Sequence, residues 1–306
     1  MESIRKEIMA WPEETAKLDK ERILAQERPE GVTVDREHWY RKDRSPWHSY
    51  EIVRPVGKET GKGIVIEIHG GAWIYGNKEL NENHTMYLSS KGWTAVSLSY
   101  GLVRNVTLFD TMKDIFRFLC HISKHREALG LDFSKVLLTG DSAGAHLSAL
   151  TYALLQDEGM RKLYGIEETP DFSVTALGLS HPVMCLEPLG AMGDTPEKDK
   201  LISEEMLRMM TGLENYEESP IYGCMSFDDF AGKVTWPPLF IVTSRADGWR
   251  VNTNRSLAVL DSLKVPYTLQ DFGWREDLGH VFHIGYWTMP EAKKANDSML
   301  EWFKAL

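Results

Sequence analysis

Residues 135–147 read KVLLTGDSAGAHL, and the rest of the sequence is arranged around this stretch. Valine, leucine and threonine residues come first, then a short turn that carries Ser142, and then a segment rich in alanine and leucine. This order predicts a buried strand, a tight turn and a helix. Gly140 and Gly144 flank the serine, because a side chain at either position would collide with the neighbouring backbone. The serine hydroxyl then stands at a helix N-terminus, where free N–H groups favour negative charge.

Strand-like and helix-like patterns alternate along most of the chain. We expect an outer strand at 47–55 and further strands at 63–68, 94–100, 135–140, 174–183, 239–243 and 267–272. Helices are expected at 80–90, 108–122 and 143–154, in a segment that ends near 263, and from 288 onward. This alternation predicts a single α/β domain over residues 1–306, with a mostly parallel sheet and helices on both of its faces.

Two segments interrupt the alternation. Residues 1–45 are highly charged, and we expect two helices there, the second beginning at Pro12 because proline suits a first helical position. Residues 186–236 are acidic and contain one expected helix near 198–210. This second segment is also rich in methionine, at Met192, Met206, Met209, Met210 and Met225. We predict that the two segments together form a helical cap.

Composition limits the partners of the protein. The formal net charge of -10 argues against nucleic acid or an anionic membrane as the main partner. The first residues are charged and lack the apolar core of a signal peptide, and no stretch is long and apolar enough for a transmembrane helix. Three scattered cysteines, Cys120, Cys185 and Cys224, fit a reducing compartment better than disulfides or a metal site. We therefore predict a cytoplasmic protein that holds no metal.

A serine nucleophile needs a base, and that base needs a carboxylate to orient it. In sheets of this kind, reactive groups follow the carboxyl ends of strands. Asp247 follows the strand expected at 239–243, and His280 follows the strand expected at 267–272. The order Ser142, Asp247, His280 is the one found in α/β-hydrolases, and we predict these three residues as the catalytic triad.

Other residues compete for the two supporting roles. His181 lies near the end of the strand at 174–183 and is the serious rival for the base, whereas His283 would require the loop to be aimed differently. Asp271 and Asp277 are alternatives for the acid, although Asp277 shares a loop with the histidine and would have to fold back onto it.

A second glycine motif, HGGAW at 69–73, follows the strand at 63–68. Attack on an ester builds negative charge on the carbonyl oxygen, and each preorganised N–H donor is worth on the order of 10²–10³ in rate. Glycine leaves the backbone bare enough to approach that oxygen. We predict the N–H groups of Gly70, Gly71 and Ala143 as the oxyanion hole, and we expect Trp73 and Tyr75 to contact the substrate.

These motifs, with Asp247 and the HVF sequence at 280–282, resemble the hormone-sensitive-lipase-like family of α/β-hydrolases over roughly residues 45–306. The resemblance implies a cofactor-free serine carboxylesterase with a cap made by the N-terminal segment and a later insertion. It also implies that Asp141 helps to hold the oxyanion loop. The chain departs from the family where arginine-leucine-alanine-proline commonly follows Tyr100, where Gly248 replaces a proline, and where Val281 replaces a glycine.

The function expected from these residues is hydrolysis of small, short-acyl esters, such as acetyl esters, through an acyl-enzyme. An aryl formamidase would use the same groups, so the sequence does not separate the two activities. A non-catalytic small-molecule receptor of the same fold is a further alternative, although the histidine that such receptors lose is present. A homodimer is compatible with the sequence.

Overall fold

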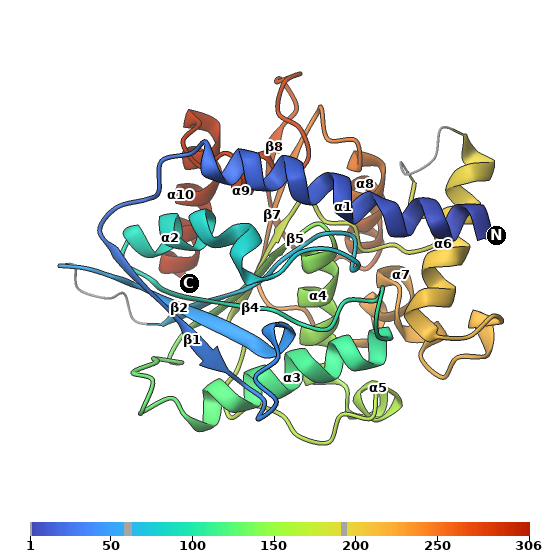
Figure 1. Ribbon diagram of the computed structural model, residues 1–306, viewed down its shortest axis with the longest axis horizontal. Helices are drawn as coiled ribbons and strands as arrows, with labels where there is room; N and C mark the ends of the chain where they lie inside the picture. The colour runs from blue at the N-terminus through green and yellow to red at the C-terminus, as the bar shows by residue number, and fades with distance from the viewer. Residues whose placement is uncertain (1, 58–62, 191–194) are drawn as a thin grey trace.

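A single twisted sheet forms the centre of the computed structural model, which describes residues 2–57, 63–190 and 195–306 (Figure 1). Its strand order within these ranges is β1-β2-β4-β3-β5-β6-β7-β8. The strands are β1 (Val32–Trp39), β2 (Ser49–Pro55), β3 (Ile64–Ile68), β4 (Thr94–Leu98), β5 (Val136–Asp141), β6 (Ala176–Ser180), β7 (Leu239–Ser244) and β8 (Thr268–Phe272). β1 and β2 run antiparallel to their neighbours, and β3 to β8 are parallel.

Helices cover both faces of the sheet, as the alternating pattern predicts. They are α1 (Glu2–Leu24), α2 (Glu82–Ser90), α3 (Leu108–Lys124), α4 (Ala143–Gln156), α5 (Glu158–Leu163), α6 (Pro196–Thr211), α7 (Phe227–Phe230), α8 (Arg250–Ser262), α9 (Phe282–Gly285) and α10 (Pro290–Ala305). Short 3₁₀ helices lie at Pro46–His48, Lys78–Asn81, Tyr216–Glu218, Tyr222–Cys224 and Ala231–Lys233. No helix within the described ranges is long and apolar enough to cross a membrane.

The core is divided into two layers by the pleat of the sheet. Ile64 and Ile66 of β3 join the cluster that contains residues of α3 and α4, whereas Val65 joins the cluster that contains residues of α2 and α10. Successive side chains of a strand point to opposite faces, so a parallel strand covered on both faces must be apolar throughout. All five residues of β3 are buried, including one carboxylate, Glu67, which lies beneath the functional site.

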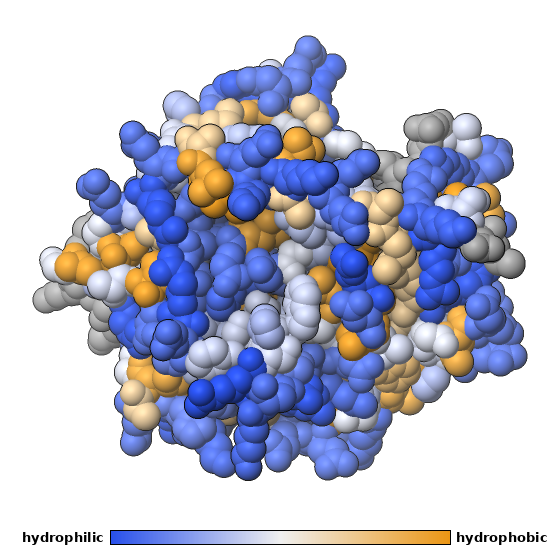
Figure 2. Space-filling model, viewed as in Figure 1, coloured by the Kyte–Doolittle hydropathy of each residue, from blue (hydrophilic) through white to orange (hydrophobic). Residues whose placement is uncertain are grey.

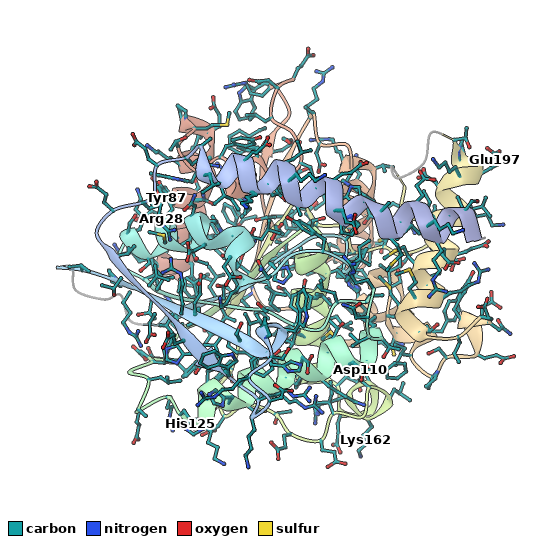
Figure 3. The ribbon with its side chains drawn as sticks, in the orientation of Figure 1. Arg28, Tyr87, Asp110, His125, Lys162 and Glu197 are labelled. Carbon is teal, nitrogen blue, oxygen red and sulfur yellow. The ribbon has the colours of Figure 1, made fainter. Side chains whose placement is uncertain are left out.

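The ends of the sequence-predicted helices are set by local chemistry. Thr107 and Asp110 form a capping box at the start of α3, where Asp110 is labelled in Figure 3. Arg28, which follows α1, lies beside α2 (Figure 3) and forms an ion pair with Glu82. Hydrophilic residues cover most of the face shown in Figure 2, with hydrophobic residues in separate groups.

The N-terminal segment differs from the prediction in two ways. Pro12 lies inside one continuous helix, α1, rather than at the start of a second helix. Burial of Ile8 and partial burial of Trp11 against the core offset the cost of an interior proline, which is about 3 kcal/mol. Residues 32–39 form the edge strand β1, which we did not predict, so the strand predicted as outer, β2, is the second in the sheet.

Helix α1 crosses the upper part of the molecule in Figure 1, and its N-terminal end packs beside α6. Lys198 on α6 donates to the carboxylate of Glu7 at 2.6 Å, and Arg5 lies 3.5 Å from Glu205. The two segments predicted to form the cap are therefore in contact. Met192, one of the methionines predicted there, lies outside the described residues.

Candidate active site

The nucleophile predicted from the sequence occupies a strained turn between β5 and α4. Ser142 has φ 53° and ψ −118°, a conformation that non-glycine residues rarely adopt. A Cβ atom on Gly144 would collide with the carbonyl oxygen of Ile68, and one on Gly140 would collide with the carbonyl oxygen of Gly144. Both glycines are thus required by the close approach of neighbouring backbone, and the strand, turn and helix occur in the predicted order.

The predicted base and acid lie in direct contact. His280 Nδ1 is 2.7 Å from Asp247 Oδ1, and the Asp247 side chain is fully buried while that of His280 is 24% exposed. Asp247 Oδ1 also accepts the N–H of Trp249 at 2.8 Å. An ionised carboxylate can only accept, so His280 carries its proton on Nδ1 and leaves Nε2 free to act as a base. Nε2 has no hydrogen-bond partner among the described residues, and His280 lines the same cavity as Ser142.

The rival histidines are used elsewhere in the core. His181 Nε2 lies 3.1 Å from the Ser244 hydroxyl, and His283 Nε2 lies 2.9 Å from the Ser180 hydroxyl. Both histidines are buried, and neither lines the cavity around Ser142. Burial and neighbouring histidines hold the pKa of each well below its ordinary value.

The rival carboxylates are paired with arginines. Arg250 binds both oxygens of Asp271, at 2.8 and 2.6 Å, and Arg275 binds both oxygens of Asp277, at 2.7 Å each. Neither aspartate lies against a histidine or lines the cavity. The geometry therefore brings together Ser142 with the pair that the chain order predicted.

The oxyanion loop differs from the prediction at one donor. The N–H of Gly70 is donated to Asp141 Oδ1 at 2.9 Å, so this group is not available to an oxyanion and the role predicted for Gly70 is not retained. The same bond agrees with the loop-holding role that the resemblance implies for Asp141. The backbone N–H groups of Gly71, Ala72 and Ala143 donate no hydrogen bond to any of the described residues. Ala72, which has a left-handed backbone with φ 49°, was not among the donors predicted from the sequence.

The two aromatic residues predicted to contact substrate are placed differently from each other. Tyr75 lines the cavity and packs edge-on against Trp11, with ring centroids 5.9 Å apart. Trp73 is 1% exposed and donates its Nε1–H to His146 Nδ1 at 3.1 Å, so it belongs to the core beneath the loop. His146 in turn donates from Nε2 to the carbonyl oxygen of Met225. The predicted substrate contact of Trp73 is therefore not supported by its position.

The cavity measures about 690 Å³ and is closed on one side by α1. The α1 residues that line it recur at helical spacing: Trp11, Thr15, Leu18, Asp19 and Arg22. Opposite them lie Tyr75, Trp249 and Tyr286, together with Ser142 and His280. None of the methionines within the described ranges lines this cavity, and of the two segments predicted to form the cap only α1 contributes lining residues. Within the part of the chain that the structure describes, no three or more histidine, cysteine, aspartate or glutamate side chains lie close enough together to hold a metal ion.

Comparison with known proteins agrees with the fold. The BD-FAE family model matches residues 50–263, well over half of the chain. Esterase B from Lactobacillus rhamnosis has the same fold with a TM-score of 0.90 and 29% identity, over 99% of this chain and 95% of that one. The same enzyme has been solved inhibited by a C4-C4 tributyrin phosphonate, at a TM-score of 0.89 and 28% identity, over 100% of this chain and 96% of that one.

Curated relatives match over shorter segments. An arylesterase from Saccharolobus solfataricus is 32% identical over 111 residues, which are 36% of this chain and 36% of that protein. A probable carboxylic ester hydrolase from Mycobacterium tuberculosis is 35% identical over 117 residues, 38% of this chain and 27% of that protein. The match thus spans about a third of these relatives' lengths. From the family model, the sheet and the placement of Ser142, the chain belongs to the BD-FAE family and to the hormone-sensitive-lipase-like α/β-hydrolases.

Proposed function

We propose that this protein hydrolyses small carboxylic esters with short acyl chains through an acyl-enzyme on Ser142. The observation that carries the proposal is the cavity lined by both Ser142 and His280, whose ring is oriented by Asp247. A cavity of about 690 Å³ is in the range that encloses a small molecule.

The mechanism follows from the atoms that face this cavity. His280 Nε2 takes the proton of the Ser142 hydroxyl as the oxygen attacks the ester carbonyl, and Asp247 stabilises the resulting imidazolium. The N–H groups of Gly71, Ala72 and Ala143 bind the developing oxyanion. His280 then returns the proton to the leaving alcohol, and a water molecule, activated in the same way, releases the acid.

The substrate range is argued from the walls of the cavity. Leu18, Tyr75 and Trp249 offer apolar surface, while Asp19 and Arg22 offer polar groups on α1. A short acyl group with a polar alcohol would suit this mixture. The structure of esterase B inhibited by a tributyrin phosphonate supports a short acyl group for the substrate of this protein as well.

Hydrolysis of p-nitrophenyl esters from acetate to octanoate tests the proposal. We expect kcat/KM to fall as the acyl chain lengthens and to fall at least about 10³-fold in Ser142→Ala at every length. Preference for octanoate would contradict the short-acyl part. Activity on aryl formamides with none on any ester would favour the formamidase, and binding without turnover of either would favour the receptor.

We also propose that α1 and residues 186–236 act as a cap over one α/β domain, that the protein is cytoplasmic, and that it forms a homodimer. Sedimentation of the purified chain would check the last point, and a monomer at micromolar concentration would contradict it.

A further inference from the structure

A group of buried charges lies directly beneath the oxyanion loop. Glu67 on β3 and Asp141 at the end of β5 are both almost fully buried. The side-chain amide of Asn81 donates to both of them, at 3.0 Å to Glu67 Oε1 and at 2.7 Å to Asp141 Oδ1. A nearby positive charge would favour the ionised form of buried carboxylates that lie this close together.

The nearby group is His84 on α2, whose protonation follows from its partners. Its Nε2 faces Asn296 Oδ1 at 3.1 Å, and the amide of Asn296 is used as a donor to the carbonyl oxygen of His283 at 3.0 Å. The Asn296 oxygen must therefore accept, so Nε2 of His84 carries a proton. Nδ1 of His84 lies 2.9 Å from Glu67 Oε1. A contact this short between a ring nitrogen and a carboxylate oxygen requires a second proton between the two atoms.

We propose that His84 is a positioning residue whose imidazolium pairs with Glu67, so that Asp141 stays ionised and holds the oxyanion loop through the N–H of Gly70. This inference rests on the proposed esterase function, since it concerns the same site. The bond from Asn296 to the carbonyl oxygen of His283 extends the network to the segment that carries His280.

The remaining groups around these side chains are few. His84 faces Glu67, Asp141 and the ring of His283, whose centroid is 6.2 Å away. Asp141 faces Glu67 and His280. Its charge also adds to the effect of burial in raising the pKa of the Tyr100 hydroxyl.

The direction of each pKa agrees with this arrangement. Burial alone would lower the pKa of His84, but the Glu67 carboxylate and the hydrogen bonds outweigh it, so the pKa lies above its ordinary value. Burial, followed by the charge of Glu67, raises the pKa of Asp141 to about 6. Asp141 is therefore ionised at neutral pH by a narrow margin, and loss of the His84 charge would remove that margin.

The test is the pH dependence of kcat/KM for a short ester in wild type, His84→Gln and Glu67→Gln. We expect the midpoint of the acid limb to move up by about one pH unit in His84→Gln, which from a wild-type midpoint of about 6 is about a fivefold loss of kcat/KM at pH 6 relative to wild type. In Glu67→Gln, which removes the like charge beside Asp141, the midpoint should not rise above that of wild type. The matched control is His121→Gln, which replaces a histidine on α3 that contacts the Tyr50 hydroxyl. This variant should leave the midpoint unchanged.

A purely structural role would lower activity or stability in His84→Gln without raising the midpoint, and that result would overturn the proposal. ¹⁵N NMR of the wild type gives a second readout that needs no activity and no variant. At pH 7, both ring nitrogens of His84 should have the shifts of an imidazolium, and a neutral ring would overturn the proposal. Because this readout does not use turnover, inactivity on all esters would refute the proposed function without deciding the charge of His84.

Discussion

At the scale of single residues, the site depends on backbone conformations that side chains ordinarily avoid. Ser142 and Ala72 both have positive φ, at 53° and 49°, and neither is a glycine. Strain of this kind costs on the order of 1–3 kcal/mol per residue and persists only where the surroundings enforce it. The close packing of Gly144 against Ile68 is part of that enforcement.

Gly144→Ala tests this enforcement. The added Cβ would collide with the carbonyl oxygen of Ile68, so the strand carrying the oxyanion loop or the turn at Ser142 must shift. We expect a loss of about 1–3 kcal/mol of stability, seen as a lower Tm, and at least a hundredfold loss of kcat/KM. Gly223→Ala, whose Cβ would meet nothing within 4 Å, is the control and should change neither quantity. An unchanged Tm and rate in Gly144→Ala would contradict this account of the turn.

At the residue scale, the contact between Asp247 and His280 could be expected from the sequence because each residue follows a recognisable strand. It did not predict that Gly70 would give its N–H to Asp141, since a hydrogen bond between positions 71 residues apart depends on the packed structure. The ordered contacts of His84 with Glu67 and Asn296 were missed for the same reason.

At the scale of elements, the parallel strands were the most predictable part of the molecule. Their apolar runs are dictated by burial on both faces, as in β3 and β5. The edge strand β1 was missed because its sequence, VTVDREHW, carries charges where a covered strand would be apolar. It also has an irregular register between Asp35 and His38, which breaks the alternation that would reveal it.

Strand β2 contains a buried carboxyl group, Glu51, whose ionisation gives a testable pH dependence of stability. Glu51 is fully buried and accepts a hydrogen bond from the Ser97 hydroxyl at 3.3 Å. Burial, followed by the charge of Glu82, raises the pKa of Glu51 to about 8 from an ordinary value of 4.5. The folded state therefore binds this proton more tightly than the unfolded state, so stability falls as pH rises from about 4.5 through 8.

Glu51→Gln removes this group while keeping its shape. We expect the gain in Tm over wild type to be larger at pH 9 than at pH 5, by at least about 3 °C, because wild type must ionise a buried carboxylate at the higher pH. Thermal melts of both proteins across this range check the prediction. A gain that is the same at both pH values would show that Glu51 does not titrate as described.

At the scale of the whole molecule, the parallel sheet collects groups that are far apart in sequence at one edge. The turn after β5, the segment after β7 and the loop after β8 deliver Ser142, Asp247 and His280 to the same side. Helix α1 then closes one side of the cavity. Two side chains hold this part of the chain against the Gly285 carbonyl oxygen by donating hydrogen bonds to it: Arg22 on α1 and Gln26 just after α1. The sequence predicted a cap but not which cap residues would line the cavity, because a highly charged helix has no clear apolar face that would identify its buried side.

The most direct test of the central claim is covalent labelling of the nucleophile. A short-chain p-nitrophenyl alkylphosphonate should release one equivalent of p-nitrophenol per chain and leave a phosphonate ester on Ser142, located by mass spectrometry of the digested protein. Ser142→Ala should release none. Labelling of another residue in the wild type, or an equal release from Ser142→Ala, would contradict the assignment of Ser142 as the group that attacks the ester.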